Sequence, residues 1–300
     1  MISAYLRFRK PTLEGDRYTI ENPISVLVRK KGLVKLSNRY AIPFDSETKR
    51  SILRVVYLAL ENGIKFGEGI YEWKLDCKNR TIETHQGIKF RFDRAGLLDE
   101  TFLYQIHFSG FDLTDKVVVT AGAYIGDTPL FYSYYGAKVY GFEPDPISYS
   151  QALENIGLNP TLMGNIVIKN YAIGVDGEIA FPVNPEDSGG SSLYRKDGFR
   201  TARIKSKSVS TILSEFNISE PFLLDLDIKG SEFSVIEDAS ISRFQRVRIE
   251  YSPYLLRSRK ETLQYLISKL KQYGFEKTRI YKHNYYRYDL MSHGTLEAEK

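Results

Sequence analysis

The sequence has a single cysteine, Cys77, among its 300 residues. One cysteine excludes an intramolecular disulfide and a zinc site built on several thiolates. Histidine is also scarce. The four histidines show no metal-ligand spacing, so we assign no residue as a metal ligand.

Long apolar runs are missing as well. No stretch approaches the roughly 18 apolar residues that a membrane-spanning helix needs, and the first residues, MISAYLRFRKPT, lack the apolar region of a signal peptide. Charge of one sign does not dominate either, since 42 Lys and Arg are spread among 37 Asp and Glu. These absences predict a soluble cytoplasmic protein with no membrane partner, and they do not favour a nucleic-acid partner.

The first part of the chain is predicted to be a small α+β accessory domain over residues 1–85. The expected elements here and just beyond are short strands at 17–28 and 33–42, an amphipathic helix at 46–62, a hairpin over 80–93 that turns near Gln86-Gly87, and a helix at 97–108. Nothing in residues 1–85 is chemically distinctive. We consider two roles for this domain, recognition of an acceptor and formation of a homo-oligomer.

Residues 86–300 form the larger predicted domain, in which strands and helices alternate from Lys116 onwards. The expected strands are 116–120, 138–142, 165–171, 221–228 and 245–250, with helices at 128–135, 146–156, after Gly230 and at 258–273, and a closing hairpin of 275–281 and 285–290. The hydrophilic stretch 186–201 is a candidate lid or binding loop. Alternation at this spacing predicts an α/β fold with a mostly parallel sheet and helices on both faces.

The stretch KVVVTAGAYIGDT, residues 116–128, predicts a buried strand that ends in a glycine turn. Gly122 and Gly126 differ in spacing from the Gly-x-Gly-x-x-Gly of a dinucleotide turn. Glu143 ends the next strand about 20 residues further on, where a carboxylate can accept hydrogen bonds from two ribose hydroxyls. Taken singly, the glycines fit a tight connection and Glu143 fits a helix-start acid. Together they favour an adenosine ligand without phosphates, and S-adenosylmethionine fits better than NAD or ATP.

Five segments, AGAYIGDT, VYGFEPDP, ALENIGLN, NYAIG and LDLDIKGSE, resemble in this order the motifs of the FkbM-type S-adenosylmethionine-dependent methyltransferases. The resemblance covers roughly residues 87–252. It implies the Rossmann-like class I methyltransferase fold, a mostly parallel sheet of seven strands whose last strand is antiparallel. It also implies O-methylation of a sugar or another small-molecule hydroxyl, so the expected partner is a small-molecule or glycan acceptor.

The resemblance also implies roles for single residues. Those expected to bind or frame the cofactor are Thr120, Gly122, Ala123, Gly126, Asp127, Thr128, Glu143, Pro144, Tyr171 and Ala172. Those expected near the transferred methyl group are Asp227, Glu232 and Glu250. A sugar hydroxyl needs a base or a metal, so these carboxylates are candidate general bases, and a divalent cation such as Mg²⁺ is a candidate cofactor. Alternatively, Glu232 complements a helix N-terminus and Glu250 is a satisfied strand-end acid.

The chain departs from the family pattern at three places. Thr120 stands where relatives usually carry an acid. Asp225 and Lys229 stand where relatives carry lysine and glutamate, an exchange that would preserve an ion pair if the two residues formed one. Relatives often have a histidine near Ser252, and the sequence has none there. These departures keep a non-catalytic binding protein with the methyltransferase fold open as an alternative. An RNA methyltransferase is a second alternative. It is disfavoured because no Asn-Pro-Pro-aromatic or Asp-Pro-Pro-aromatic motif follows the fourth strand.

Overall fold

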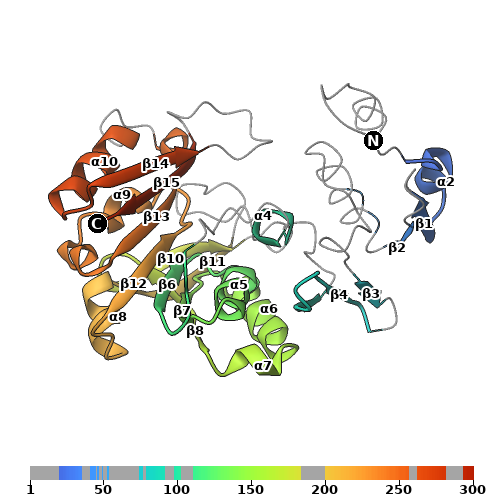
Figure 1. Cartoon of the computed structure of the whole chain (residues 1–300), viewed down its shortest axis with the longest axis horizontal. Coiled ribbons are helices and arrows are strands. Elements are labelled where there is room, and N and C mark those ends of the chain that lie inside the picture. Colours follow the sequence, from blue (N-terminus) through green and yellow to red (C-terminus); the bar gives the residue numbers. More distant parts are fainter. Residues whose placement is uncertain are drawn as a thin grey trace. The chain divides into compact units, whose positions relative to one another are not determined.

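The chain divides into two compact units, Met1–Gln105 and Ile106–Lys300 (Figure 1). The computed structural model describes residues 20–35, 41–44, 46, 49, 53, 74–76, 79–91, 98–102, 111–183, 200–256, 262–281 and 293–300. Each unit is described below by itself.

The first unit begins with a short helix, α2 (Pro23–Val28), and a pair of antiparallel strands, β1 (Gly32–Lys35) and β2 (Ala41–Phe44). The predicted strand over 17–28 is therefore wrong for residues 23–28. Proline at the first helical position fixes the backbone in a helix-compatible conformation. The Asn22 side chain then ties the start of the helix to β1, donating to the Leu33 carbonyl at 2.8 Å.

A second small sheet in this unit has the order β3 (Lys74–Asp76), β4 (Thr81–Glu83) and β5 (Lys89–Arg91). Strands β4 and β5 are antiparallel and turn at Gly87, whose φ is 80°, so the predicted hairpin is confirmed. Helix α4 (Leu98–Phe102) lies within the predicted helix at 97–108. The predicted helix at 46–62 lies almost entirely outside the described residues.

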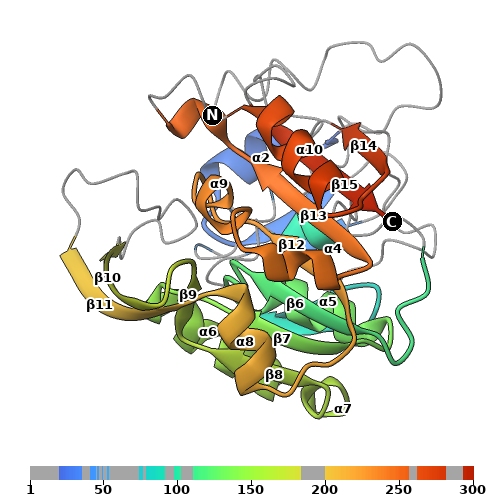
Figure 2. The ribbon, with the colours of Figure 1, turned by 90° about the vertical axis from the view of Figure 1, so that its left-hand side faces the viewer.

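The second unit is built on a sheet of seven strands in the order β14-β15-β13-β12-β6-β7-β8 (Figure 2). Their bounds are β6 (Val117–Ala121), β7 (Lys138–Phe142), β8 (Ile166–Lys169), β12 (Pro221–Leu226), β13 (Arg246–Tyr251), β14 (Lys277–Tyr281) and β15 (Gly294–Glu299). Strand β15 is antiparallel to both neighbours, and the other pairs are parallel. The predicted fold, a mostly parallel sheet with an antiparallel last strand, is confirmed.

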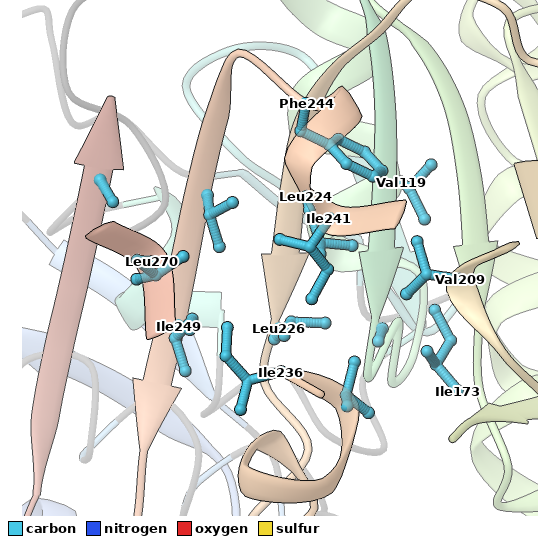
Figure 3. Packing of buried hydrophobic residues seen from close by; sticks show 14 of the residues in the cluster. Val119, Ile173, Val209, Leu224, Leu226, Ile236, Ile241, Phe244, Ile249 and Leu270 are labelled. Carbon is cyan, nitrogen blue, oxygen red and sulfur yellow. The ribbon is translucent and has the colours of Figure 1, made fainter. Parts of the chain in front are cut away.

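Helices cover the sheet. They are α5 (Asp127–Tyr134), α6 (Pro146–Gly157), α7 (Pro160–Met163), α8 (Val209–Glu215), α9 (Glu232–Val235) and α10 (Leu263–Gln272), with 3₁₀ turns at Ala239–Arg243 and Pro253–Leu255. The Asp145 side chain caps the start of α6, where it accepts from Ile147 N at 2.8 Å. Figure 3 shows the main apolar core, where strand residues such as Leu224 and Ile249 pack against Ile236 and Leu270 from the helices.

A second, smaller sheet of this unit lies in the stretch between the third and fourth core strands, where no strand was predicted beyond residue 171. Its order is β10 (Gly177–Val183), β11 (Arg200–Lys207) and β9 (Tyr171–Ile173). The predicted third strand is thus two strands that separate at Asn170, whose amide donates to the Glu143 and Pro144 carbonyls at 2.8 and 3.0 Å. Most of the candidate lid, 186–201, lies outside the described residues.

The closing hairpin is partly as predicted. Strand β14 confirms the expected strand at 275–281, and its partner is β15 at Gly294–Glu299. The strand predicted at 285–290 lies outside the described residues.

The strand order fixes where a ligand can bind. From β6 the chain proceeds through β7 to β8 on one side, and then returns to place β12 and β13 on the other side. The order in which strands are added to the sheet therefore reverses between β6 and β12. These two strands are parallel, and their register pairs Ala121 with Leu226. In open α/β sheets the crevice beyond the carboxyl ends of the strands at such a switch point is the ligand site.

Candidate active site

The turn that follows β6 approaches the end of β12 so closely that only glycine fits. Gly122 has a φ of +83°, and a Cβ added to it would lie 2.0 Å from the Asp227 carbonyl oxygen. The Asp227 N–H in turn donates to the Ala121 carbonyl at 3.0 Å. The glycine is therefore required by the close approach of two strand ends at the switch point of the sheet.

The rest of the turn leads directly into helix α5. Gly126 caps the helix with a φ of +84°, and a Cβ there would lie 3.3 Å from Ala152 on α6. Ala123, Asp127 and Thr128 are all buried, and their role in binding the cofactor stays a prediction. Asp127 also places a negative charge in the first turn of α5, where it complements the helix dipole.

Glu143 lies just after β7 and is 6% exposed. Its Oε2 accepts from Tyr124 N at 2.7 Å, and its Oε1 accepts from Asp145 N at 2.8 Å. Burial outweighs these two hydrogen bonds and raises the pKa of Glu143 to about 8. A carboxylate can accept about four hydrogen bonds, so each oxygen retains capacity for one ribose hydroxyl.

The residues expected near the adenine lie on the same side of the sheet as Glu143. Asn170 holds the Pro144 carbonyl, and the Tyr171 ring stacks on Phe142 with centroids 6.3 Å apart. Lys207 from β11 lies over the Tyr171 ring, with its Nζ 4.6 Å from the ring centre. Ala172 is buried. The small sheet β9–β11 therefore supplies this part of the candidate site.

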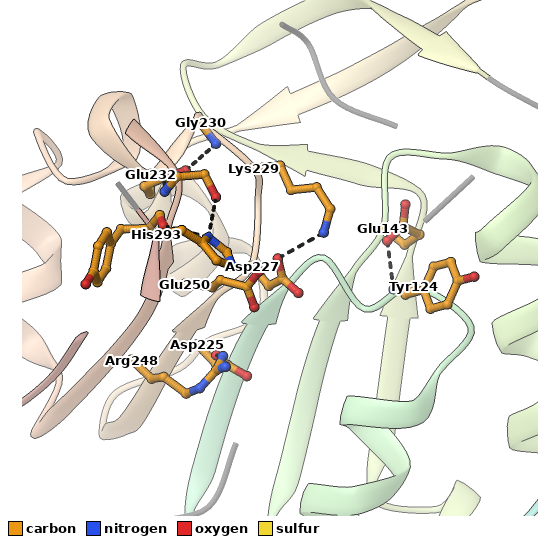
Figure 4. Close-up of polar contacts among 12 residues, drawn as sticks. Tyr124, Glu143, Asp225, Asp227, Lys229, Gly230, Glu232, Arg248, Glu250 and His293 are labelled. Atoms are coloured by element: carbon orange, nitrogen blue, oxygen red, sulfur yellow. Dashed lines mark hydrogen bonds and ion pairs between the residues drawn. The ribbon is translucent and has the colours of Figure 1, made fainter. Parts of the chain in front are cut away.

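Asp227 and Lys229 occupy the turn after β12. The Lys229 Nζ lies 3.5 Å from Asp227 Oδ1, and the side chains are 33% and 26% exposed (Figure 4). The φ of Lys229 is +43° and that of Gly230 is +102°. The candidate site thus contains a lysine ammonium beside the carboxylate that is expected to face the methyl group.

Glu232 lies at the start of α9 and is fully buried. Its Oε2 accepts from Gly230 N at 2.5 Å, and its Oε1 accepts from Ser252 N at 2.6 Å. Burial raises the pKa of Glu232 to about 7. One oxygen of Glu232 accepts from an amide that follows β12, and the other accepts from an amide that follows β13. This geometry favours a role in positioning the two strand ends over direct proton transfer.

A histidine that the sequence did not single out lies beside Glu250. His293 Nε2 is 3.8 Å from Glu250 Oε1, and both side chains are buried. His293 Nδ1 lies 3.2 Å from the Tyr251 carbonyl and 3.4 Å from Ser252 Oγ. The register of β13 with β15 pairs Tyr251 with Gly294 and so carries His293 to the end of β13. The sequence has no histidine close to Ser252 along the chain, but the fold brings His293 beside it.

Asp225 and Lys229 are not partners, so the exchange of their charges does not preserve an ion pair between them. Asp225 Oδ1 accepts from Arg248 Nη1 at 2.5 Å, and Asp225 Oδ2 accepts from the Tyr132 hydroxyl at 2.8 Å. Thr120 is the register neighbour of Asp225 on β6 and is buried with it. The expectation that Thr120 helps to bind or frame the cofactor stays a prediction.

Neither a metal site nor a membrane span is found in the described part of the chain. Among these residues, no group of three or more His, Cys, Asp or Glu side chains is placed to hold a metal ion. No helix in these ranges has the length and apolar character needed to cross a membrane.

Comparisons with known proteins agree with this arrangement. A family model described as "Methyltransferase FkbM domain" matches residues 121–277. No curated protein matches the sequence.

Solved structures that resemble the chain include the METTL16 methyltransferase domain, at 13% identity and a TM-score of 0.44, with 89% of this chain and 86% of that one covered. Magnesium protoporphyrin IX methyltransferase from Synechocystis PCC 6803 with bound SAM is 13% identical at a TM-score of 0.39, with 68% of this chain and 78% of that one covered. A human methyltransferase 10 domain containing protein is 12% identical at a TM-score of 0.39, with 68% of this chain and 81% of that one covered. At TM-scores below 0.5, these likenesses carry no inference about the acceptor.

Proposed function

Because this chain belongs to the FkbM methyltransferase family, we propose that it transfers the methyl group of S-adenosylmethionine to an oxygen atom of a sugar or another small-molecule hydroxyl. The observation that carries the proposal is the group of residues at the switch point of the sheet. There the glycine turn after β6 meets the Asp227 carbonyl, with the Glu143 carboxylate at the end of the neighbouring strand.

The residues present fit the cofactor. Glu143 offers a buried carboxylate for the ribose hydroxyls, and Gly122 lets the turn after β6 pack directly against the Asp227 carbonyl at the end of β12. Tyr171 and Pro144 would border the adenine. When bound, S-adenosylmethionine supplies a methyl group on a sulfonium, which is already a good leaving group for in-line displacement by an oxygen.

The chain must align the hydroxyl and take up its proton. His293 with Glu250 is the pair best placed for the second task. A carbonyl only accepts, so the contact with Tyr251 assigns the proton to Nδ1 of His293 and leaves Nε2 as the basic nitrogen. Glu250 lies 3.8 Å from Nε2 and would stabilise the imidazolium that forms when the acceptor proton arrives. Asp227 would lie beside the reacting groups.

Two measurements on the full chain test the proposed function. Isothermal titration calorimetry with S-adenosylmethionine and S-adenosylhomocysteine is expected to show micromolar binding of both. Transfer of radiolabelled methyl is then measured on a panel of monosaccharides, glycans and small alcohols, with total RNA as a separate arm. Absence of binding would refute the cofactor assignment. Binding with labelling of RNA alone would refute the acceptor class, and binding with no labelling would support the non-catalytic alternative.

A further inference from the structure

Lys229 adopts a backbone conformation that side chains rarely take. Its φ is +43°, in the left-handed region that glycine and asparagine favour, and Gly230 continues the turn at +102°. Such strain persists only where the surrounding structure enforces it, and it clusters at functional sites. The strained position lies three residues after the end of β12, at the switch point of the sheet.

The strained turn directs the lysine side chain back onto Asp227. The Asp227 backbone is held by its N–H to Ala121 at 3.0 Å and by the contact of its carbonyl with the Gly122 turn. The Lys229 ammonium lies 3.5 Å from the Asp227 carboxylate, and Figure 4 shows the side chain extending on the side where Glu143 lies. The ammonium is therefore a partly exposed charge that is paired with Asp227 at the switch point of the sheet.

The net charge at the switch point depends on the ion pair of Lys229 and Asp227. Burial holds the pKa of Glu143 at about 8, so in the empty site at pH 7 that carboxyl is mostly protonated. Asp227 carries a negative charge that the Lys229 ammonium balances. S-adenosylmethionine carries one positive charge more than S-adenosylhomocysteine, on the sulfonium. A carboxylate near the sulfonium favours the charged form, and an ammonium beside that carboxylate reduces the preference.

We propose that Lys229 is a specificity-determining residue that lowers the preference of this site for S-adenosylmethionine over S-adenosylhomocysteine by acting as the counter-ion of Asp227. The inference rests on the proposed function, since it assumes that the crevice binds these two ligands. It has a consequence for turnover: the thioether product competes with the cofactor more strongly in the wild type than in a variant that lacks this charge.

The test is the ratio of the dissociation constants of the two ligands, measured by calorimetry at pH 7 on full-length variants. Lys229→Met removes the charge and keeps the length of the side chain, and Lys229→Arg keeps the charge. Lys229→Asn removes the charge with a residue that tolerates the left-handed conformation. Lys271→Met, at an exposed position on α10, is the matched control.

The Met and Asn variants are expected to raise the preference for S-adenosylmethionine about three- to tenfold, as for a partly exposed charge at this distance. The Arg variant and the Lys271 control should retain the wild-type ratio. In the Asp227→Asn background the effect of Lys229→Met on the ratio should shrink or reverse. A further check is salt dependence, because added salt should reduce the difference between wild type and Lys229→Met.

The possible results separate the two proposals. Equal changes for both ligands, or an unchanged ratio in Lys229→Met and Lys229→Asn, would overturn the role of Lys229 and leave the cofactor assignment intact. Failure of every variant to bind either ligand would refute the proposed function, and this inference with it. Thermal unfolding of each variant checks that a change in the ratio does not arise from misfolding.

Discussion

Asp225 on β12 and Arg248 on β13 form an ion pair in which each side chain is 1% exposed and the oxygen–nitrogen distance is 2.5 Å. The register of the parallel strands places the two residues side by side. The Tyr132 hydroxyl from α5 donates to the second Asp225 oxygen at 2.8 Å. The pair therefore links two central strands to the helix that begins at the cofactor turn.

Replacement of Arg248 by Met should destabilise the protein by about 3–5 kcal/mol, because it leaves the Asp225 carboxylate buried without its counter-charge. Urea denaturation measures this loss. The double variant Asp225→Leu/Arg248→Met should recover most of the stability. Arg246→Met, on the same strand but with its partner Glu299 partly exposed, should cost about 1 kcal/mol or less. A loss for Arg248→Met no larger than for Arg246→Met would contradict the expectation.

Replacement of Thr120 by Asp would place a second carboxylate beside buried Asp225. We expect a loss of about 3 kcal/mol relative to Thr120→Asn, which has nearly the same shape without the charge. The loss should be smaller at pH 5 than at pH 8, because the buried acid retains its proton at low pH. Denaturation of both variants at the two pH values measures it. Equal stability of the Asp and Asn variants at pH 8 would show that the site tolerates the acid.

Substitution of Gly122 by Ala should prevent cofactor binding and destabilise the second unit. The added Cβ would lie 2.0 Å from a backbone carbonyl that cannot move alone, and the φ of +83° disfavours any side chain. Gly157→Ala, where a Cβ meets nothing within 4 Å, is the matched control and should be neutral or stabilising. Calorimetric binding of S-adenosylmethionine together with thermal unfolding tests both variants, and normal binding by Gly122→Ala would disprove the close approach.

Binding of S-adenosylmethionine should tighten as the pH rises from about 6.5 to about 8. The pKa of Glu143 in the empty site is about 8, and ribose hydroxyls donate best to the ionised carboxylate, so binding releases a proton. The dissociation constant should therefore fall by up to about tenfold per pH unit below pH 8. Calorimetry in buffers of different ionisation enthalpy measures the proton released.

Two matched variants, Glu143→Gln and Glu178→Gln, test whether Glu143 is the acid that releases the proton on binding. Glu143→Gln should weaken binding about tenfold or more at pH 8 and remove the pH dependence, because a hydrogen bond to a charged group is lost. Glu178→Gln, at an exposed position on β10, should change neither the affinity at pH 8 nor the pH dependence of binding. A pH dependence that survives in Glu143→Gln would assign the released proton to another group.

Replacement of His293 by Gln should lower the turnover of the acceptor found in the transfer screen by about 100-fold or more, the usual contribution of a general base. Affinity for S-adenosylmethionine should change less than about twofold, because His293 lies with Glu250 and Ser252 and away from the ribose carboxylate. The acidic limb of the pH–rate profile should also disappear. Full turnover in His293→Gln would remove His293 from the reaction, and His85→Gln in the first unit is the control.

The sequence by itself determined most of the central fold. Apolar β-branched runs such as Val117–Val119 predict buried strands because they suit a sheet covered on both faces. Local chemistry also fixed the glycine turn and the cap that Asp145 gives to α6, since both depend on residues next to one another in the chain. Strand β11 escaped prediction because most of its residues are polar and only Ile204 and Ser206 are buried. Strand β10 begins with exposed residues, and its buried end, Phe181–Val183, is short.

The tertiary structure alone decided which charges meet. Asp225 pairs with Arg248 and not with Lys229, because parallel register brings residues of different strands together while residues close in sequence diverge at the turn. His293 reaches Glu250 and Ser252 because the antiparallel last strand returns across the end of β13. Local sequence sets the conformation of each segment, whereas pairing across the sheet depends on register, which packing of the whole unit selects.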